Sequence, residues 1–528
     1  MKKSVLIVAI VTLLTVLPYV VGPPPVVAKT LRWAFSGDVY SMDPHAHTVS
    51  FTNAFHYHIY ETLARYNKDL KIEPALATSW KVIEPTVWRF TLRHGVKFHN
   101  GNPFTADDVV ASLKRALGSP LKANITQIKD CRKVDDYTVD VILHGAHPLV
   151  LNGLTNIGIM DSEWMTENKC FTPVDPSKGQ ESYATTHANG TGPFMLESRQ
   201  PDAQTVLVVN PSWWDKAEHN LTRIVFTPIK SDATRVAALL SGELDFMHPA
   251  PLQDLDRISR TPGMKLLEAP DLRTIFLAIN QAPAEPFESN IKGKNPLKDI
   301  RVRKALYQAI DVESIRSRIM RGKSRIAGLF VAPEIPGFDP ALNGRLLPYD
   351  PDAAKKLLVE AGYPDGFEIG LDVPNDRYVN DEKIAQAIVP MWARIGVKAK
   401  LTAQPGSAHF NKANAGKSDI WMFGWATLPM LDSYSVLSQI LSSAREKLGS
   451  NNPGGYKNPK VDELVDKVAV ELDEPKRLKM ISEAFKFAKE DCVLIPLHQQ
   501  PMAWVTRDNV KIIQTADDLP RLWYARID

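Results

Sequence analysis

The chain has 528 residues, which corresponds to three or four folding units of about 150 residues each. Its 44% hydrophobic and 23% charged residues are typical of a globular protein and exclude a disordered, collagen-like or polytopic membrane chain. The net charge of +3 arises from 63 basic and 60 acidic residues that are interspersed, so we expect no nucleic-acid partner.

The first 28 residues have a composition of their own. Lys2 and Lys3 precede an apolar run over residues 5–21, and the small residue Ala28 lies where a signal peptidase would cleave. This pattern predicts a signal peptide, 1–28, with Lys29 as the first residue of the exported chain. The alternative, a retained membrane anchor, is disfavoured because the run is short and prolines interrupt it.

An exported chain meets oxidising conditions, but this one has only three cysteines, Cys131, Cys170 and Cys492. Disulfides are therefore not its scaffold. A single bridge between Cys131 and Cys170 remains open, because sequence does not show whether the two side chains come within bonding distance.

The next segments predict a strand at 31–35, an aromatic stretch at 51–60, and a hairpin. In this hairpin, alternating apolar residues at 88–92 and 96–98 flank a turn that ends at Gly95. Thr105 and Asp108 form a capping box before a helix at 109–117. Residues 66–185 therefore read as a hairpin-and-helix subdomain.

Further along, a helix followed by glycine and then by a strand recurs. Helices are predicted at 232–241, 352–361 and 380–395, and each is followed by glycine, at Gly242, Gly362 and Gly396. Pro390 predicts a kink in the third helix. Helices that return the chain to strands at this rate indicate an α/β fold with mixed layers.

Enzyme motifs are missing. Gly322-Lys323-Ser324 and Gly416-Lys417-Ser418 lack the earlier glycine of a phosphate-binding loop, and HExxH, GxSxG and CxxC do not occur. We therefore predict no catalytic residues, no cofactor and no enzymatic activity.

Two histidine pairs are the candidates for a metal site. His56 and His58 would face opposite sides of a helix, whereas His45 and His47 lie in a predicted loop and could chelate together. No cysteine or carboxylate cluster nearby completes a coordination shell, so no metal ligand is assigned.

Several segments together resemble the family 5 extracellular solute-binding proteins of ABC importers, which include peptide- and nickel-binding members. The matching segments, in chain order, are Tyr60-Glu61-Thr62-Leu63, the run at 88–115, Gly190-Thr191-Gly192-Pro193-Phe194, and the runs at 235–246, 300–311 and 350–363.

The resemblance implies a two-lobed clamshell in the periplasm. Lobe I would be discontinuous (29–65, 186–275 and 496–528), with 66–185 as an inserted subdomain, and lobe II would span 276–495. A small-molecule or oligopeptide ligand would be captured between the lobes by a monomer that delivers it to an inner-membrane ABC permease.

The resemblance also implies ligand-binding residues near Gly424-Trp425. Peptide-binding members commonly carry an aspartate three residues after this tryptophan, which pairs with the ligand's ammonium group, but here that position is Leu428. Asp432 is the nearest acid and is kept as a substitute anchor or hydroxyl acceptor, with the cap of a helix at 433–441 as the alternative. Trp425 is predicted to stack on the ligand, with core packing as its alternative.

Arg377, before the helix at 380, lies where the family often places a ligand-facing basic residue, and its planar guanidinium suits a carboxylate or phosphate. A surface arginine is the alternative. Tyr40 and His47 complete the predicted ligand-binding set, because the family uses this loop at the cleft mouth.

Three hypotheses follow. The first is a periplasmic binding protein for a peptide-like or other small organic solute. The second is a nickel or metal-chelate binding protein of the same fold, motivated by the histidines. The third, an exported hydrolase, is disfavoured by the missing nucleophile motifs.

Overall fold

The computed structural model describes residues 29–174, 179–445 and 448–528. The predicted signal peptide, residues 1–28, lies outside them. Within the described ranges, no helix is both long enough and apolar enough to cross a membrane.

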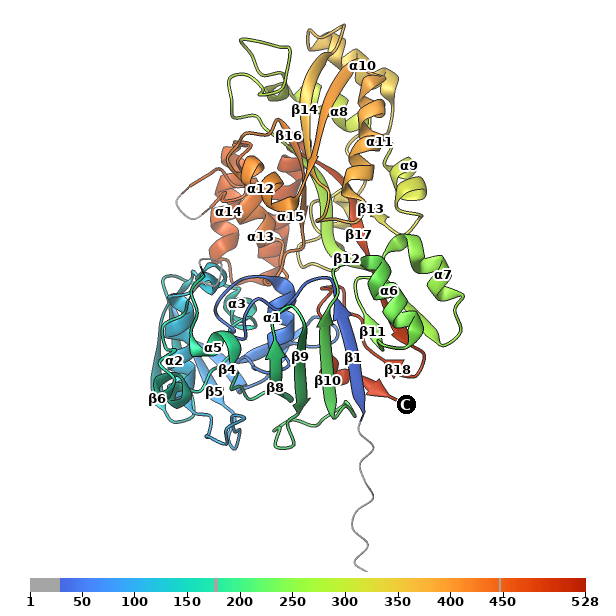
Figure 1. Ribbon diagram of the computed structural model, residues 1–528. Coiled ribbons are helices and arrows are strands. Elements are labelled where there is room, and N and C mark those ends of the chain that lie inside the picture. The colour runs from blue at the N-terminus through green and yellow to red at the C-terminus, as the bar shows by residue number, and fades with distance from the viewer. Residues whose placement is uncertain (1–28, 175–178, 446–447) are drawn as a thin grey trace, which may run out of the picture.

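The largest sheet of the described chain has eleven strands and extends through both halves of the molecule (Figure 1). The short strand β13 (Arg325–Ile326) pairs with β17 beside the main order. The main order is β15 (Val397–Gln404), β14 (Phe367–Pro374), β16 (Ile420–Trp425), β12 (Met264–Ile279), β17 (Leu494–Arg507), β11 (Phe246–Met247), β1 (Thr30–Phe35), β10 (Arg223–Pro228), β9 (Gln204–Val209) and β8 (Phe194–Gln200).

Two long antiparallel strands, β12 and β17, connect the halves (Figure 1). The pairing of 264–270 with 501–507 lies in the lower half, and that of 274–278 with 494–499 lies in the upper half. The register shifts between Pro270 and Thr274, so the ladder is interrupted where the chain passes from one half to the other.

A second sheet and a helix form the subdomain. The sheet order is β4 (Ala77–Glu84), β5 (Val87–Leu92), β7 (Thr138–Leu143) and β6 (Ile128–Asp135), and its hydrophobic core is separate from those of the large sheet. The predicted hairpin is wrong in its partner: β5 pairs with β4 and β7, whereas 96–98 forms no strand. The predicted helix and its capping box are confirmed in α2 (Ala106–Leu117).

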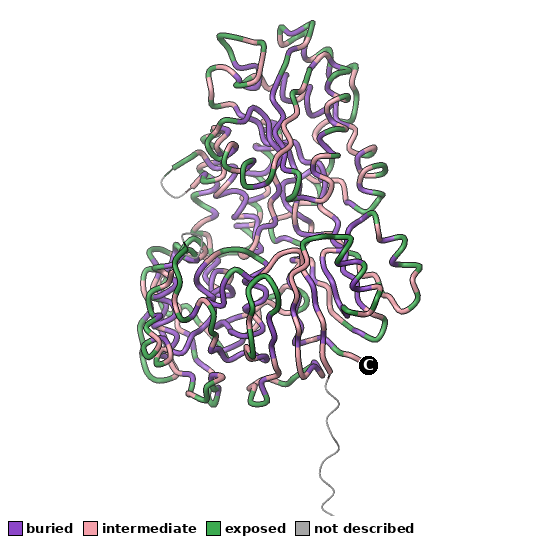
Figure 2. The backbone as a smooth tube through the Cα atoms, in the orientation of Figure 1, coloured by how far each residue is buried: buried purple, intermediate pink, exposed green. Residues whose placement is uncertain are grey.

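The helix–glycine–strand units are confirmed. The helices α6 (Asp232–Ser241), α10 (Pro351–Glu360) and α11 (Asp381–Ala393) are each followed by a glycine with positive φ, between 86° and 89°, and then by a strand. Glycine adopts this backbone conformation without the steric cost that a Cβ atom brings. Figure 2 shows buried chain in the interior of both halves. One hydrophobic cluster lies in the lower half, another in the upper half, and a third includes residues of both.

The remaining helices and short strands cover these sheets and connect them. They are α1 (Ser50–His56), β2 (Ala64–Tyr66), β3 (Ile72–Pro74), α3 (Val150–Leu154), α4 (Ser162–Glu167), α5 (Tyr183–Thr186), α7 (Leu255–Ser259), α8 (Ile300–Gln308), α9 (Val312–Ser314), α12 (Gly406–Asn414), α13 (Tyr434–Val436), α14 (Pro459–Val470), α15 (Glu474–Glu490), β18 (Val510–Lys511) and β19 (Arg526–Ile527).

A buried ion pair joins the subdomain to the lower half. Arg115 of α2 donates two hydrogen bonds to the Asp43 carboxylate, at 2.7 and 2.5 Å, and neither side chain is exposed. Arg115 also donates to the carbonyl of Cys170 at 3.1 Å. The three cysteines are buried and free, so the bridge left open between Cys131 and Cys170 is not formed.

We expect Arg115→Ala to lower the free energy of unfolding by about 3 to 5 kcal/mol, because it leaves the Asp43 carboxylate buried and unpaired. Urea denaturation measures the change. The matched control is Lys467→Ala, which removes an exposed pair with Glu463 and should cost less than about 1 kcal/mol. Equal effects of the two substitutions would contradict this role for the buried pair.

Candidate functional site

Two adjoining cavities lie between the halves. The larger, of about 710 Å³, is bounded by 48–57 of the lower half, by subdomain residues at 123–127 and 144–147, and by 425–439, Leu448 and Ser450 of the upper half. The smaller, of about 390 Å³, lies beside the register shift of β12. Ser50, Trp425 and Leu428 line both cavities, which together form what we call the cleft.

Trp425, at the end of β16, lines both cavities of the cleft. Its indole Nε1 donates to the Ser435 hydroxyl at 3.1 Å, and its ring lies 5.8 Å from that of Phe423. These contacts hold the indole in one orientation. Because the residue is only partly buried, an apolar ring face is left for a bound molecule.

Arg377 and Arg273 both line the smaller cavity of the cleft. The two guanidinium groups are 5.4 and 6.0 Å from the centre of the Tyr378 ring. Within the described residues, the Arg377 side chain has no hydrogen-bonded or ion-paired acceptor. The surrounding protein displaces part of the water around Arg377 and Arg273 adds a second positive charge, and both effects lower the Arg377 pKa.

Asp432, predicted as a substitute anchor, lines neither cavity of the cleft, and its side chain is buried. Its carboxylate accepts two hydrogen bonds from Arg477, at 2.9 and 2.6 Å, and both side chains are buried. It also accepts from the backbone N–H of Tyr434, which agrees with the capping alternative. Asp432 therefore holds α13 and α15 together.

Tyr40 and His47 lie outside the lining of both cavities. The Tyr40 side chain is 68% exposed, and burial lowers the pKa of His47 to about 4, so this imidazole is neutral at pH 7. The loop does reach the cleft, but through Thr48 and Ser50.

The histidine pairs do not converge on a metal site. His45 hydrogen-bonds the carbonyl of Gly158, and His56 that of Ser41, at 2.8 and 2.7 Å. In the ranges that the structure covers, no three residues among histidine, cysteine, aspartate and glutamate are placed to hold a metal ion.

Most of the polar lining of the larger cavity was missed from the sequence. It consists of uncharged side chains, whose convergence depends on tertiary folding rather than on any motif: Thr48, Ser50, Asn53, Asn124, Thr126, Gln127, Asn156, Ser435, Ser438, Gln439 and Ser450. Arg273 was also missed, because it stands singly in a strand without a motif.

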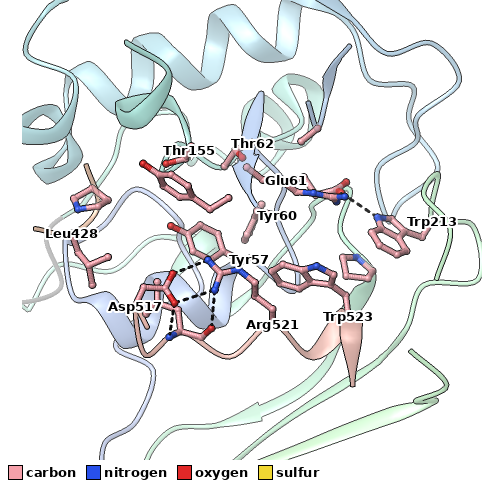
Figure 3. Close-up of a pocket in the computed structure, with 16 residues that line it drawn as sticks. Tyr57, Tyr60, Glu61, Thr62, Thr155, Trp213, Leu428, Asp517, Arg521 and Trp523 are labelled. Atoms are coloured by element: carbon pink, nitrogen blue, oxygen red, sulfur yellow. Dashed lines mark hydrogen bonds and ion pairs between the residues drawn. The ribbon is translucent and has the colours of Figure 1, made fainter. Parts of the chain in front are cut away.

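A third cavity of about 50 Å³ adjoins the cleft at Leu428 and contains the carboxylates of Glu61 and Asp517 (Figure 3). Asp517 is ion-paired with Arg521 at 2.7 Å. Glu61 accepts hydrogen bonds from Trp213 and Trp214 at 3.1 and 2.7 Å, and burial raises its pKa to about 7.

Comparisons with known proteins place the chain in a family. A profile described as bacterial extracellular solute-binding proteins, family 5 Middle, matches residues 71–447. Heme-binding protein A of Haemophilus influenzae is 28% identical over 474 residues (84% of this chain and 82% of that protein), and the dipeptide-binding protein of Escherichia coli is 27% identical over 488 residues (87% and 86%).

A solved structure agrees with this family assignment. The periplasmic binding protein DppA from Helicobacter pylori, in complex with the peptide STSA, superposes with a TM-score of 0.78 at 24% identity and covers 95% of this chain and 98% of that one. The fold is therefore that of the two-lobed periplasmic binding proteins.

The chain belongs to the family 5 bacterial extracellular solute-binding proteins. It is a solute-binding component of an ABC transporter and not an enzyme, as the sequence predicted.

Asp432→Ala should lower the melting temperature of the unliganded protein, because removing one partner leaves the Arg477 guanidinium buried without its counter-charge, at a cost of about 3 to 5 kcal/mol. Differential scanning calorimetry measures this. Asp466→Ala, which removes an exposed pair with Arg445, is the control and should change little. An unchanged melting temperature for Asp432→Ala would contradict the structural role of this residue and would leave ligand binding as its expected role.

The buried Glu61 carboxyl predicts a pH dependence of stability. Its pKa rises from 4.5 to about 7 on folding, so between these values the folded state holds a proton that the unfolded state has lost. Its contribution to the free energy of unfolding should therefore fall as the pH rises from about 4.5 to about 7. Urea denaturation across this range should show the fall in the unmodified chain and a smaller one in Glu61→Gln. Identical profiles would contradict the raised pKa.

Proposed function

We propose that this protein captures a peptide-like or other small organic solute in the cleft between its two lobes, in the periplasm, and delivers it to an inner-membrane ABC permease. The observation that carries the proposal is the cavity of about 710 Å³ whose walls come from both lobes and from the subdomain. Family membership supports the same role.

The lobe boundaries of this proposal follow the sequence division, with lobe I at 29–65, 186–275 and 496–528, the subdomain at 66–185 and lobe II at 276–495. The register shift in β12 and the facing residue Gln500 supply a hinge, because the interrupted ladder holds these residues less firmly than the regular pairing on either side. A solute that contacts both lobes binds the closed state better and shifts the population toward it.

Contacts already cross between the lobes beside the cleft. Asn152 donates to the carbonyl of Met430 at 2.7 Å, and the Tyr66 hydroxyl donates to the same carbonyl at 3.1 Å. Met430 lines the larger cavity. These two hydrogen bonds connect the lobes next to the cavity, so a bound solute would lie beside contacts that stabilise the closed state.

Export and partners complete the proposal. The basic, apolar and small residues of 1–28 support cleavage near Ala28, which would leave a monomer with Lys29 at its N-terminus. The nickel or metal-chelate alternative is less favoured, because no three residues among histidine, cysteine, aspartate and glutamate in the described ranges are placed to hold a metal ion.

Small-angle X-ray scattering tests the capture mechanism. Solute released from freshly purified protein by denaturation is identified by mass spectrometry and added back to stripped protein. The radius of gyration should decrease on saturation because the lobes close over the solute. Saturable binding with an unchanged radius would contradict the hinge.

One tryptophan variant and one tyrosine variant locate the binding site when their affinities for the released solute are measured. Trp425→Ala should weaken binding about tenfold, or about 1.4 kcal/mol, through loss of ring contact. Tyr40→Ala, an exposed aromatic outside the cleft lining, should leave affinity unchanged. The reverse pattern would move the site to the loop at Tyr40.

A further inference from the structure

The charge of the cleft lining is one-sided. Among its described residues, the two cavities are lined by the guanidinium groups of Arg273 and Arg377 and by no carboxylate. Two histidines, His144 and His147, line the larger cavity, and burial lowers the pKa of His147 to about 4, which makes it neutral at pH 7. The lining therefore offers positive charge without a matching anion.

The carboxylates nearest in sequence to the cleft residues are occupied elsewhere. Asp432 is held by two hydrogen bonds from Arg477. Asp376 accepts from the backbone N–H of Gly406 at 2.7 Å, and Asp381 accepts from those of Arg377 and Tyr378. None of the three lines the cleft.

Asp271 and Asp518 are further acidic neighbours of the arginine pair, and Asp271 neutralises the pair only in part. Its carboxylate lies 3.7 Å from Arg273 Nε and accepts from Gln500 at 3.2 Å. Asp518 also acts on Arg273, but burial and the neighbouring Asp271 raise its pKa to about 8, so it carries little negative charge at pH 7. Arginine donates in a planar fork that binds a carboxylate through two hydrogen bonds, so an acidic ligand group would supply the missing charge.

The larger cavity offers hydrogen bonds without charge. Asn53 Oδ1, Gln127 Nε2 and Asn156 Nδ2 are buried, line this cavity and have no hydrogen-bond partner among the described residues. These side chains are at most 9% exposed. Buried polar atoms without partners are costly, so a ligand that supplies both a donor and an acceptor here would be favoured.

We propose, on the basis of the proposed function, that the cleft selects a solute with a carboxylate head, an uncharged hydrogen-bonding body and no ammonium group. The carboxylate binds at Arg273 and Arg377, and the body fills the amide- and hydroxyl-lined cavity. N-acylated peptides and sugar acids share this chemistry.

A free ammonium group is disfavoured for a physical reason. A buried cation without a paired anion loses its hydration and gains nothing in return. Leu428, at the junction of the two cavities, is apolar, and the adjacent guanidinium groups repel a further positive charge.

Isothermal titration calorimetry on stripped full-length protein tests this selectivity. The probes are N-acetyl-Ala-Phe, its parent dipeptide Ala-Phe, the carboxamide of the acetylated dipeptide, the sugar acid lactobionate and its neutral parent lactose. At least one of the two acids should bind at least about tenfold tighter than its own parent, because a buried charge is worth at least that factor. Whether the acetylated dipeptide or the sugar acid binds shows whether the solute is a peptide derivative or a sugar derivative.

Variants assign the effect to the arginine pair. Arg377→Gln should weaken the better acid about 10- to 100-fold and leave its uncharged counterpart unaffected. Arg394→Gln, an exposed arginine outside the cleft lining, should change neither. Leu428→Asp should reverse the preference toward Ala-Phe, because it returns an anion to the junction of the cavities.

The outcomes separate this inference from the proposed function. Tighter binding of Ala-Phe than of its acetylated form, an affinity unmoved by Arg377→Gln, or failure of both acids to bind at millimolar concentration would overturn the inference. If the solute released from the purified protein carries an ammonium group and rebinds with lobe closure, the inference fails and the proposed function stands. If no solute is released and none closes the lobes, the proposed function fails as well.

Discussion

The pairing of β12 with β17 is the constraint on which the rest of the structure depends. The same two strands belong to the sheet in both lobes, and their ladder is interrupted only around 270–276 and the facing residues of β17. Each lobe therefore packs around its own end of these strands, and one hydrophobic cluster includes residues of both lobes. The space between the lobes is bounded by side chains from parts of the chain as far apart as Thr48 and Val470.

The proposed hinge and the proposed anion-binding residues lie in the same part of the sheet. Arg273 lies within the interrupted stretch of β12, and Gln500, opposite it in β17, donates to Asp271 while accepting from the backbone N–H of Val379. A ligand anion at Arg273 would thus act on the segment that must bend when the lobes close. Anion binding and lobe closure would be coupled directly, because the proposed anion site and the proposed hinge share residues.

Several buried charges elsewhere in the described chain are closely paired, whereas others, such as Arg303, hydrogen-bond only backbone carbonyls. The ion pairs Asp43–Arg115, Asp432–Arg477 and Asp517–Arg521 each close at 2.7 Å or less. The first two pairs join segments that are far apart in the sequence, whereas the third joins residues four positions apart. In the cleft, by contrast, Arg273 Nε lies 3.7 Å from the Asp271 carboxylate, and the Arg377 side chain has no ion pair within the described residues, so an anionic ligand group could pair with it.

Local signals in the sequence predicted the local structure well. The capping box at Thr105 and the glycines after α6, α10 and α11 act within a few residues, so helix ends were recognisable. Strand pairing was not: 88–92 was assigned to a hairpin with 96–98, whereas its partners, β4 and β7, are chosen by packing.

The candidate site shows the same division. Trp425 and Arg377 were found because neighbouring residues in the chain resemble a family pattern. Asp432 was misplaced because its partner, Arg477, is 45 residues away, and no sequence pattern connects the two. Arg273 and the amide lining were missed because they converge only after the lobes and the subdomain assemble.

A crystal structure of the protein with its bound solute is the most direct test of the central claim that ligand is held between the lobes. The account predicts ligand density enclosed by residues 48–57, by 123–127 of the subdomain and by 425–439, Leu448 and Ser450 of lobe II, with the lobes closer together than in a ligand-free crystal. Ligand density confined to the surface of one lobe, with the cleft filled only by solvent, would contradict it.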